Sequence, residues 1–290
     1  MSALISWAGS RSAVVTALHK AVMACPVEVK RFFDPFCGGL DAAIRVNAPS
    51  RVLTDNDPDL INYFEVLRDQ GPAALLRHMS SHKNDKEYFL LTRHRHNQEI
   101  LAATDERCNF NGQDPEYKAK LAAEFYYLSR FSFRSLLRHN QAGEINSSFG
   151  KRKNTPLELY ACDMNKIEPL RAFLQGSTIG CEDFTYLTDW LNSGRLTTGD
   201  LVYLDAPFVA RNAPLSTRFG RARFGQVTQL ATQLAEAGIA VVVSGPVHDE
   251  FPAMLPGFFV DKLHCRNGAA TAYETLAASF KLPLLLDETA

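Results

Sequence analysis

The sequence predicts an α/β fold, with a mainly parallel, Rossmann-like sheet and an inserted helical region, and three observations carry this prediction. Short apolar runs bounded by Gly, Pro or Asp occur toward both ends of the chain, as buried parallel strands do. One run leads through a glycine turn and a helix to a second strand, a βαβ order. Between residues 71 and 140 the pattern is polar and helical. We expect one domain from residues 1–57 and 159–290, with 58–158 as the insertion.

Each element of this fold has its own local signal. The apolar residues of the predicted helices recur at helical spacing, and the predicted strands are short apolar runs that stop at Gly or Asp. Before the insertion we expect helices over 11–24, from Leu40, and over 59–67, with strands over 29–33 and 51–54. After it we expect strands over 177–180, 200–204 and 239–243, a helix over 226–236, and an antiparallel pair over 258–263 and 275–280.

Composition limits the possible functions. The 290 residues carry 31 Lys plus Arg against 32 Asp plus Glu, so any site for a polyanion must be local. No apolar run approaches the ~18 residues of a spanning helix, and the N-terminus does not resemble a secretion signal. Six scattered cysteines without a Cys-x-x-Cys pair favour reduced thiols and no metal site. We expect a cytoplasmic protein that makes no membrane contact.

The insertion contains a local basic segment. Between Arg130 and Lys153 six positive charges stand against the single negative charge of Glu144. Residues 140–146 within this segment have turn chemistry and are expected to form a loop or hairpin. Upstream, residues 93–96 read Arg-His-Arg-His and are expected on an exposed helix face, where no further ligands favour a metal.

Two motifs in the first region point to ligand binding. The run Asp34-Pro35-Phe36-Cys37-Gly38-Gly39 follows a predicted strand, and its glycines would let backbone N–H groups approach a ligand, although an ordinary tight turn explains it equally well. Asp55 ends the next strand, where a carboxylate can accept hydrogen bonds from ribose hydroxyls or lie solvated in a turn. A calcium loop is excluded because Leu60 and Val66 occupy its required Gly and Glu positions.

A third motif follows the predicted strand 200–204. Asp205 offers a carboxylate, Ala206 a carbonyl and Phe208 an aromatic face, while Pro207 stiffens the turn. Ligands in open α/β sheets bind at such strand ends. The set fits an aromatic amine; the alternative is a simple turn with Phe208 in the core.

Taken in order, these motifs resemble the Dam-type adenine-specific DNA methyltransferases, which use S-adenosylmethionine. The resemblance runs through Ser6–Arg11, Phe33–Gly39, Asp55–Asn62, Phe125–Lys151 and Gly199–Phe208. It implies a class I methyltransferase sheet with an inserted helical DNA-recognition domain and hairpin. It also implies methyl transfer to the exocyclic amine of adenine in a specific duplex DNA sequence, after the base is flipped out. The implied partner is double-stranded DNA, the expected state is a monomer, and restriction–modification is one implied setting.

The resemblance also assigns residues to roles. The implied catalytic residues are Asp205, Ala206, Pro207 and Phe208. The implied cofactor-binding residues are Trp7, Ala8, Gly9, Arg11, Asp34, Phe36, Gly38, Gly39, Asp55, Asp183 and Phe184. The implied DNA-binding residues are Arg130, Phe133, Arg134, Leu136, Arg138, Asn140, Asn146, Lys151, Arg152 and Lys153, with Arg138 at the position that reads a guanine edge.

Several positions depart from the family pattern and keep other hypotheses open. Arg11 replaces Lys, Leu40 replaces Gly, Ala206 replaces Pro, Phe208 replaces Tyr and Ser148 replaces Pro. The alternatives are a catalytically impaired DNA-binding module of the same fold and a methyltransferase that acts on RNA or a modified base. A second basic cluster, Arg211, Arg218, Arg221 and Arg223, either holds the flipped strand or forms a solvated loop.

Overall fold

A computed structural model describes residues 4–5, 7, 12–104, 110, 113–140, 142–207, 220–246, 250–267 and 270–282. The chain divides into two compact units. We call Met1–Ser10, Gly38–Leu40 and Thr54–Asp183 the helical unit, and Arg11–Cys37, Asp41–Leu53 and Phe184–Ala290 the sheet unit. The predicted site residues Ala8, Gly9, Arg11 and Phe208 lie outside the described residues, as do Arg211 and Arg218.

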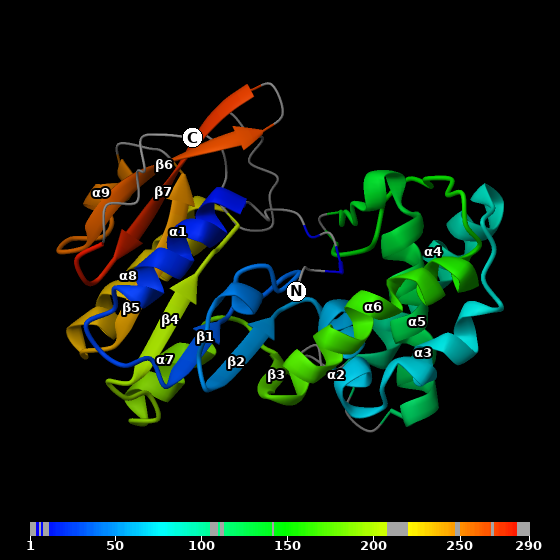
Figure 1. Cartoon of the computed structure of the whole chain (residues 1–290), viewed down its shortest axis with the longest axis horizontal. Helices are drawn as coiled ribbons and strands as arrows, with labels where there is room; N and C mark the ends of the chain where they lie inside the picture. The colour runs from blue at the N-terminus through cyan, green and yellow to red at the C-terminus, as the bar shows by residue number, and fades with distance from the viewer. Residues whose placement is uncertain are drawn as a thin grey trace. The chain divides into compact units, whose positions relative to one another are not determined.

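Seven strands form one mixed sheet in the order β3-β2-β1-β4-β5-β7-β6. The strands are β1 (Arg31–Asp34), β2 (Ser50–Asp55), β3 (Ser177–Cys181), β4 (Asp200–Leu204), β5 (Ala240–Pro246), β6 (Phe259–Asn267) and β7 (Ala270–Ala278). β1, β2, β4 and β5 pair in parallel, whereas β7 is antiparallel to both β5 and β6 (Figure 1). This sheet is consistent with a class I methyltransferase fold and confirms the predicted α/β class and the closing antiparallel pair.

The sheet unit also contains helices. They are α1 (Ser12–Met23), the 3₁₀ turn η1 (Ala43–Arg45), α7 (Tyr186–Asn192), α8 (Arg221–Glu236) and α9 (Glu250–Ala253). α1 contacts β5, β6 and β7, while α8 packs against β5. The helix predicted from Leu40 is wrong, because Leu40 has a left-handed backbone with φ of 70° and only the single turn η1 follows.

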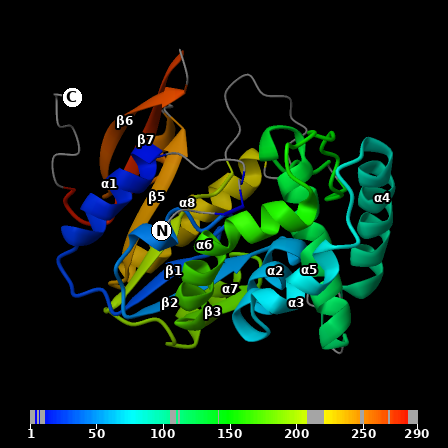
Figure 2. The ribbon, with the colours of Figure 1, turned by 45° about the vertical axis from the view of Figure 1, so that its right-hand side comes forward.

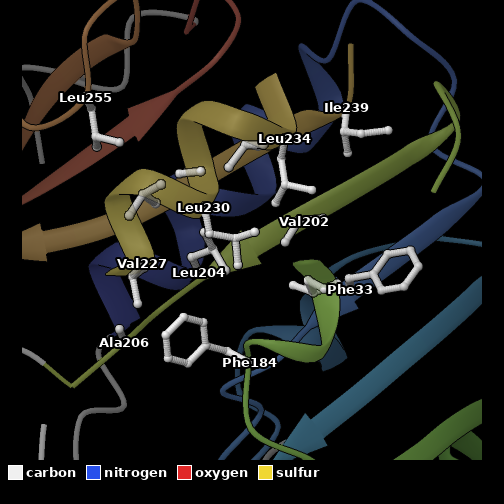
Figure 3. Packing of buried hydrophobic residues seen from close by; sticks show 14 of the residues in the cluster. Phe33, Phe184, Val202, Leu204, Ala206, Val227, Leu230, Leu234, Ile239 and Leu255 are labelled. Atoms are coloured by element: carbon white, nitrogen blue, oxygen red, sulfur yellow. The ribbon is translucent and has the colours of Figure 1, made fainter. Parts of the chain in front are cut away.

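The core of the sheet unit lies between the strands and α8. Val202 and Leu204 of β4 lie beneath side chains of α8 that include Val227 and Leu230 (Figure 3). Phe33 of β1 belongs to the same cluster and packs against Trp190 of α7. Every residue of β4 is buried. Burial on both faces explains why the predicted parallel strands are continuous apolar runs instead of alternating ones.

Helices form most of the helical unit, which also contains β3. They are α2 (Pro58–Asp69), α3 (Pro72–Met79), α4 (Lys86–Ala103), α5 (Pro115–Phe131), the 3₁₀ turn η2 (Phe133–Ser135) and α6 (Pro156–Gln175). α5 packs against α2, α3 and α4 (Figure 2). The helical character predicted for residues 71–140 is therefore confirmed for the described residues of that range. Of the described helices in either unit, none has the length and hydropathy to cross a membrane.

Local capping explains where these helices begin. Asp57 accepts a hydrogen bond from the backbone N of Leu60 at the start of α2, and Asp85 and Asp114 cap α4 and α5 in the same way. Thr155 and Glu158 form a reciprocal capping box at the start of α6. Side chains of this kind satisfy backbone N–H groups that lack partners in the first helical turn.

A buried ion-pair cluster joins three helices of the helical unit. The ring of His96 in α4 is fully buried, with Nε2 2.9 Å from Asp59 Oδ1 in α2 and Nδ1 3.1 Å from Glu124 Oε2 in α5. Burial alone would lower the pKa of His96, but the two carboxylates outweigh it and raise the pKa to about 10. His96 is therefore an imidazolium that donates both N–H groups at neutral pH.

The expected exposed face of residues 93–96 is consequently wrong for His96, although His94 is exposed. Thr92, His96 and Ile100 recur every four residues and form the buried stripe of α4. The charged residues that precede His96 in the sequence obscure this stripe.

His96→Gln should lower the free energy of unfolding by about 3 kcal/mol at pH 7, because two buried carboxylates lose their cation. The folded pKa lies above the ordinary 6.5, so the stabilisation in the unchanged protein is complete below pH 6.5 and is lost as the pH rises through about 10. Urea unfolding at pH 7 and pH 10 measures both effects. His94→Gln is the control and should change stability by less than ~0.5 kcal/mol; equal losses for the two variants would contradict the assignment.

Candidate active site

The carboxyl ends of β4 and β5 carry a polar pair in the sheet unit. The parallel ladder pairs Leu204 with Val243, so Asp205 follows in line with Ser244. Ser244 is fully buried, and its hydroxyl donates a hydrogen bond to Asp205 Oδ1. This bond restrains the rotation of the carboxyl group. Asp205 is thereby held at the strand end where the sequence predicts an amine-binding acid.

The neighbours of Asp205 differ in their burial. Ala206 is 2% exposed and belongs to the core cluster, whereas Pro207 is exposed (Figure 3). The buried side chain of Ala206 anchors the turn. Because Ala206 directly follows Asp205 in the sequence, its carbonyl group is the neighbour in the chain of the restrained carboxylate. The predicted stacking residue Phe208 lies outside the described residues.

The carboxyl end of β1 contributes a second acid to the sheet unit. Asp34 is the last residue of β1, is 1% exposed, and accepts a hydrogen bond from the backbone N of Phe36. The ring of Phe36 lies 5.3 Å from that of Phe184, and the Arg223 guanidinium lies 4.6 Å from the Phe184 ring centre. Phe184 is thus a buried aromatic residue contacted by a ring and a cation.

In the helical unit, Asp55 ends β2 and binds two backbone amides. Gly38 N donates to Oδ2 at 3.0 Å and Asp57 N donates to Oδ1 at 3.1 Å. Burial and the nearby charge of Asp57 raise the pKa of Asp55 to about 7, although the backbone hydrogen bonds oppose the shift. Asp55 is therefore not the solvated turn residue of the alternative interpretation. It is a buried acceptor poised to titrate near neutrality.

The glycine turn brings its backbone against Trp7. Gly38 has a φ of 44°, and a Cβ atom added there would lie 2.7 Å from Cδ1 of Trp7. Only glycine fits this approach. Leu40 also adopts a left-handed backbone but buries its side chain completely. Burial of a leucine, worth roughly 1.5–3 kcal/mol, offsets the backbone strain of about 1–2 kcal/mol.

The basic segment folds into a hairpin-like structure beside α4. Phe133 N donates to Ser148 O, Gly150 N donates to Phe131 O, and Ser132 forms a bridge with Phe149. Arg134 and Ser135 both have positive φ, of 58° and 55°, which makes a strained turn. Phe133 is 57% exposed at this turn.

Two residues of α4 anchor the hairpin through its backbone. Asn97 donates to Ile145 O and accepts from Ile145 N, both at 3.0 Å, and Arg93 donates to Ser147 O at 2.6 Å. His139 and Ile145 form an antiparallel bridge across the hairpin. The predicted loop or hairpin is therefore confirmed as a hairpin over its described residues.

The predicted DNA-binding residues fall into two groups. Inside the segment, Arg130 pairs with Asp163 at 3.0 Å, and Arg152 donates to the carbonyl oxygens of Arg130 and Ser132. Asn140 exchanges hydrogen bonds with Glu144, and Leu136 is partly buried. The outward group is exposed and consists of Phe133, Arg134, Arg138, Asn146, Lys151 and Lys153. The first group shapes the surface that the second presents.

Sequence reasoning missed two contributors to these arrangements. Ser244 interrupts the apolar run of β5 at its carboxyl end, and a polar residue at that point of a buried strand was a usable signal. His139 contacts both Trp7 and Asp57 from the hairpin. No local pattern marks that contact, because its partners come from distant parts of the sequence.

The fold is consistent with a class I methyltransferase, and comparison with known proteins identifies the family. A family model described as D12 class N6 adenine-specific DNA methyltransferase matches residues 7–229. The chain belongs to this family, which confirms the predicted resemblance.

Individual relatives are distant. The chain is 27% identical to the retron Ec67 DNA adenine methylase of Escherichia coli over 208 residues, which are 72% of this chain and 64% of the relative. It is 26% identical to the DNA adenine methylase of Vibrio cholerae serotype O1 over 218 residues, 74% of this chain and 66% of the relative. It is 24% identical to the type II methyltransferase M1.LlaDCHI of Lactococcus lactis subsp. cremoris over 282 residues, 92% and 89% of the two chains. The match thus spans just under two thirds of the first two relatives.

Gly38→Ala should destabilise the protein more than Gly194→Ala does. Both positions have positive φ, of 44° and 68°, but a Cβ at Gly194 would meet nothing within 4 Å. Gly194→Ala therefore measures backbone strain alone, expected to cost about 1 kcal/mol, and the excess loss in Gly38→Ala measures the clash with Trp7. Urea unfolding measures the loss of stability in each variant, and intrinsic tryptophan fluorescence reports a change in the surroundings of Trp7. Identical losses with unchanged fluorescence would contradict the packing of Trp7 on Gly38.

Proposed function

We propose that this chain transfers a methyl group from S-adenosylmethionine to the exocyclic amine of adenine in duplex DNA. The observation that carries the proposal is Asp205, fixed by Ser244 at the end of β4 in a chain of the D12 family. The amine is a weak nucleophile because its lone pair is delocalised into the ring. In this proposal Asp205 and the Ala206 carbonyl accept hydrogen bonds from the amine and localise the lone pair on nitrogen, while Phe208 stacks on the base. Formation of the N–C bond would release the thioether S-adenosylhomocysteine and one amine proton, which passes to solvent.

The donor side rests on acceptors of the right kind. When bound, S-adenosylmethionine supplies an electrophilic methyl group, and its ribose hydroxyls need hydrogen-bond acceptors. Asp55 is a buried carboxylate at a strand end, which suits this role. Within the helical unit we assign donor binding to Trp7, Gly38, Gly39 and Asp55. For Asp34, Phe36 and Phe184 of the sheet unit, and for Ala8, Gly9, Arg11 and Asp183, this role rests on the resemblance alone.

The DNA side rests on the hairpin. We propose that residues 58–158 form the DNA-recognition region and that its exposed cations contact phosphates, with Arg138 reading a guanine edge. Phe133, exposed at a strained turn and flanked by Arg134, would fill the space left by the flipped base. Arg130 and Arg152 then act as positioning residues, since their donors are bound within the protein.

Asp205→Ala should reduce methyl transfer by at least ~100-fold, because one of two acceptors for the amine is lost. Donor affinity should remain nearly unchanged. The assay follows tritium from labelled S-adenosylmethionine into unmethylated genomic DNA, with RNA as a parallel acceptor, and calorimetry measures donor binding. Asp189→Ala, an exposed acid on α7, is the matched control and should keep full activity.

Each outcome of this assay separates the candidate functions. Label in DNA that disappears only with Asp205→Ala supports the proposal. Label in RNA alone would assign the activity to RNA instead of DNA. DNA binding without any label would favour the alternative of a catalytically impaired DNA-binding module. Full turnover by Asp205→Ala would overturn the mechanism.

Donor affinity should fall roughly tenfold as the pH is lowered from 8 to 6, because Asp55 then becomes protonated and loses acceptor capacity. The sign follows from a pKa of about 7, above which the carboxyl is ionised. Calorimetric titration with S-adenosylhomocysteine at three pH values measures the slope. Asp55→Asn should bind the ligand weakly and remove the dependence; a variant that keeps the slope would assign it to another group.

A further inference from the structure

Five residues of the helical unit form a closed ring of contacts. Trp7 packs on Gly38, whose amide donates to Asp55. Asp55 accepts in turn from the amide of Asp57, and Asp57 Oδ2 lies 3.4 Å from His139 Nε2. The ring of His139 closes the circuit, with its centre 5.8 Å from that of Trp7 and a 51° angle between the rings. We call this set the Trp7–His139 circuit.

The circuit joins four separate stretches of sequence. Trp7, Gly38 and Asp55 belong to the proposed donor side. His139 lies in the hairpin between Arg138 and Asn140, which belong to the proposed DNA side. His139 is thus the point in this circuit at which the hairpin touches the donor residues.

The contacts of His139 constrain it on two sides. Its side chain is only 18% exposed, and Asp57, at 15%, also caps α2 by accepting from Leu60 N. The His139 backbone is held by the bridge to Ile145, which Asn97 anchors to α4. A shift of the hairpin must therefore move the imidazole relative to Asp57 and Trp7.

We propose that His139 is a positioning residue through which the DNA-bound hairpin organises the methyl-donor site, so that donor and DNA bind cooperatively. This inference rests on the proposed function. DNA that fixes the hairpin fixes the imidazole, which holds Asp57 and Trp7 in the arrangement that presents Asp55 and the Gly38 turn. Because coupling between two binding sites is reciprocal, bound donor must tighten DNA binding by the same factor.

The test measures the dissociation constant of S-adenosylhomocysteine with and without DNA, and that of DNA with and without S-adenosylhomocysteine. The DNA is a duplex carrying the sequence that modification-sensitive sequencing identifies in cells expressing the chain. The unchanged protein should show a coupling factor of ~10 in both directions, a typical value. His139→Ala should bring it close to 1 while donor affinity without DNA and the urea midpoint change little.

Two further variants separate the contacts of His139. His139→Gln keeps a polar side chain beside Asp57 but loses the ring, and His139→Phe keeps the ring against Trp7 but loses the polar contact. Each should restore part of the coupling, and a purely structural role would predict no such rescue. At saturating DNA, His139→Ala should raise KM for the donor about tenfold, the lost coupling factor, and leave kcat nearly unchanged. His94→Ala, on the exposed side of α4, is the matched control and should keep the full factor.

The inference and the proposed function fail differently. Methyl transfer to DNA with a coupling factor of 1 in the unchanged protein, or with an undiminished factor in His139→Ala, overturns the inference alone. A chain that transfers no methyl group to DNA overturns both, because the inference rests on the proposed function.

Discussion

The pair of amide hydrogen bonds to Asp55 is the interaction on which the arrangement of the helical unit depends. A single carboxylate binds the glycine turn through Gly38 and the start of α2 through Asp57. The same carboxylate is buried, so its ionisation costs free energy near neutral pH. The protein therefore keeps an acid at this position although burial disfavours its charged form.

Elsewhere in the protein, too, polar side chains are held by a hydrogen-bonding or oppositely charged partner. Ser244 restrains Asp205 within the sheet unit, and His96 neutralises Asp59 and Glu124 within the helical unit. The Ser244–Asp205 pair and the His96 cluster differ in what they can do. The His96 cluster has both its carboxylates satisfied and serves the scaffold, whereas Asp205 stands at a strand end where a ligand can approach.

Much of this architecture could be predicted from the sequence, because it is encoded locally. The strands around Val202 and Val242 are buried on both faces and therefore show as unbroken apolar runs. The start of α2 follows from Asp57 and Pro58. The motif at Asp205 was visible because three chemical groups stand in five residues.

The remainder depends on contacts between distant residues, which no local pattern records. His96 was placed on the surface because its neighbours Arg93, His94 and Arg95 are charged, and only its partners in α2 and α5 explain its burial. Leu40 breaks the expected helix because its backbone follows the turn that Gly38 begins. Arg130 and Arg152 read as surface cations, yet each finds an internal acceptor.

The main-chain anchorage of the hairpin on α4 has a consequence for evolution. Asn97 hydrogen-bonds to the backbone amide and carbonyl of Ile145, and Arg93 hydrogen-bonds to the backbone carbonyl of Ser147. Neither anchor therefore depends on which side chains the hairpin carries. Outward positions such as Arg138 and Asn146 are then able to diverge between lineages while the loop keeps its geometry. Under the proposed function, single substitutions at these positions would alter the recognised DNA sequence without rebuilding the framework of the hairpin.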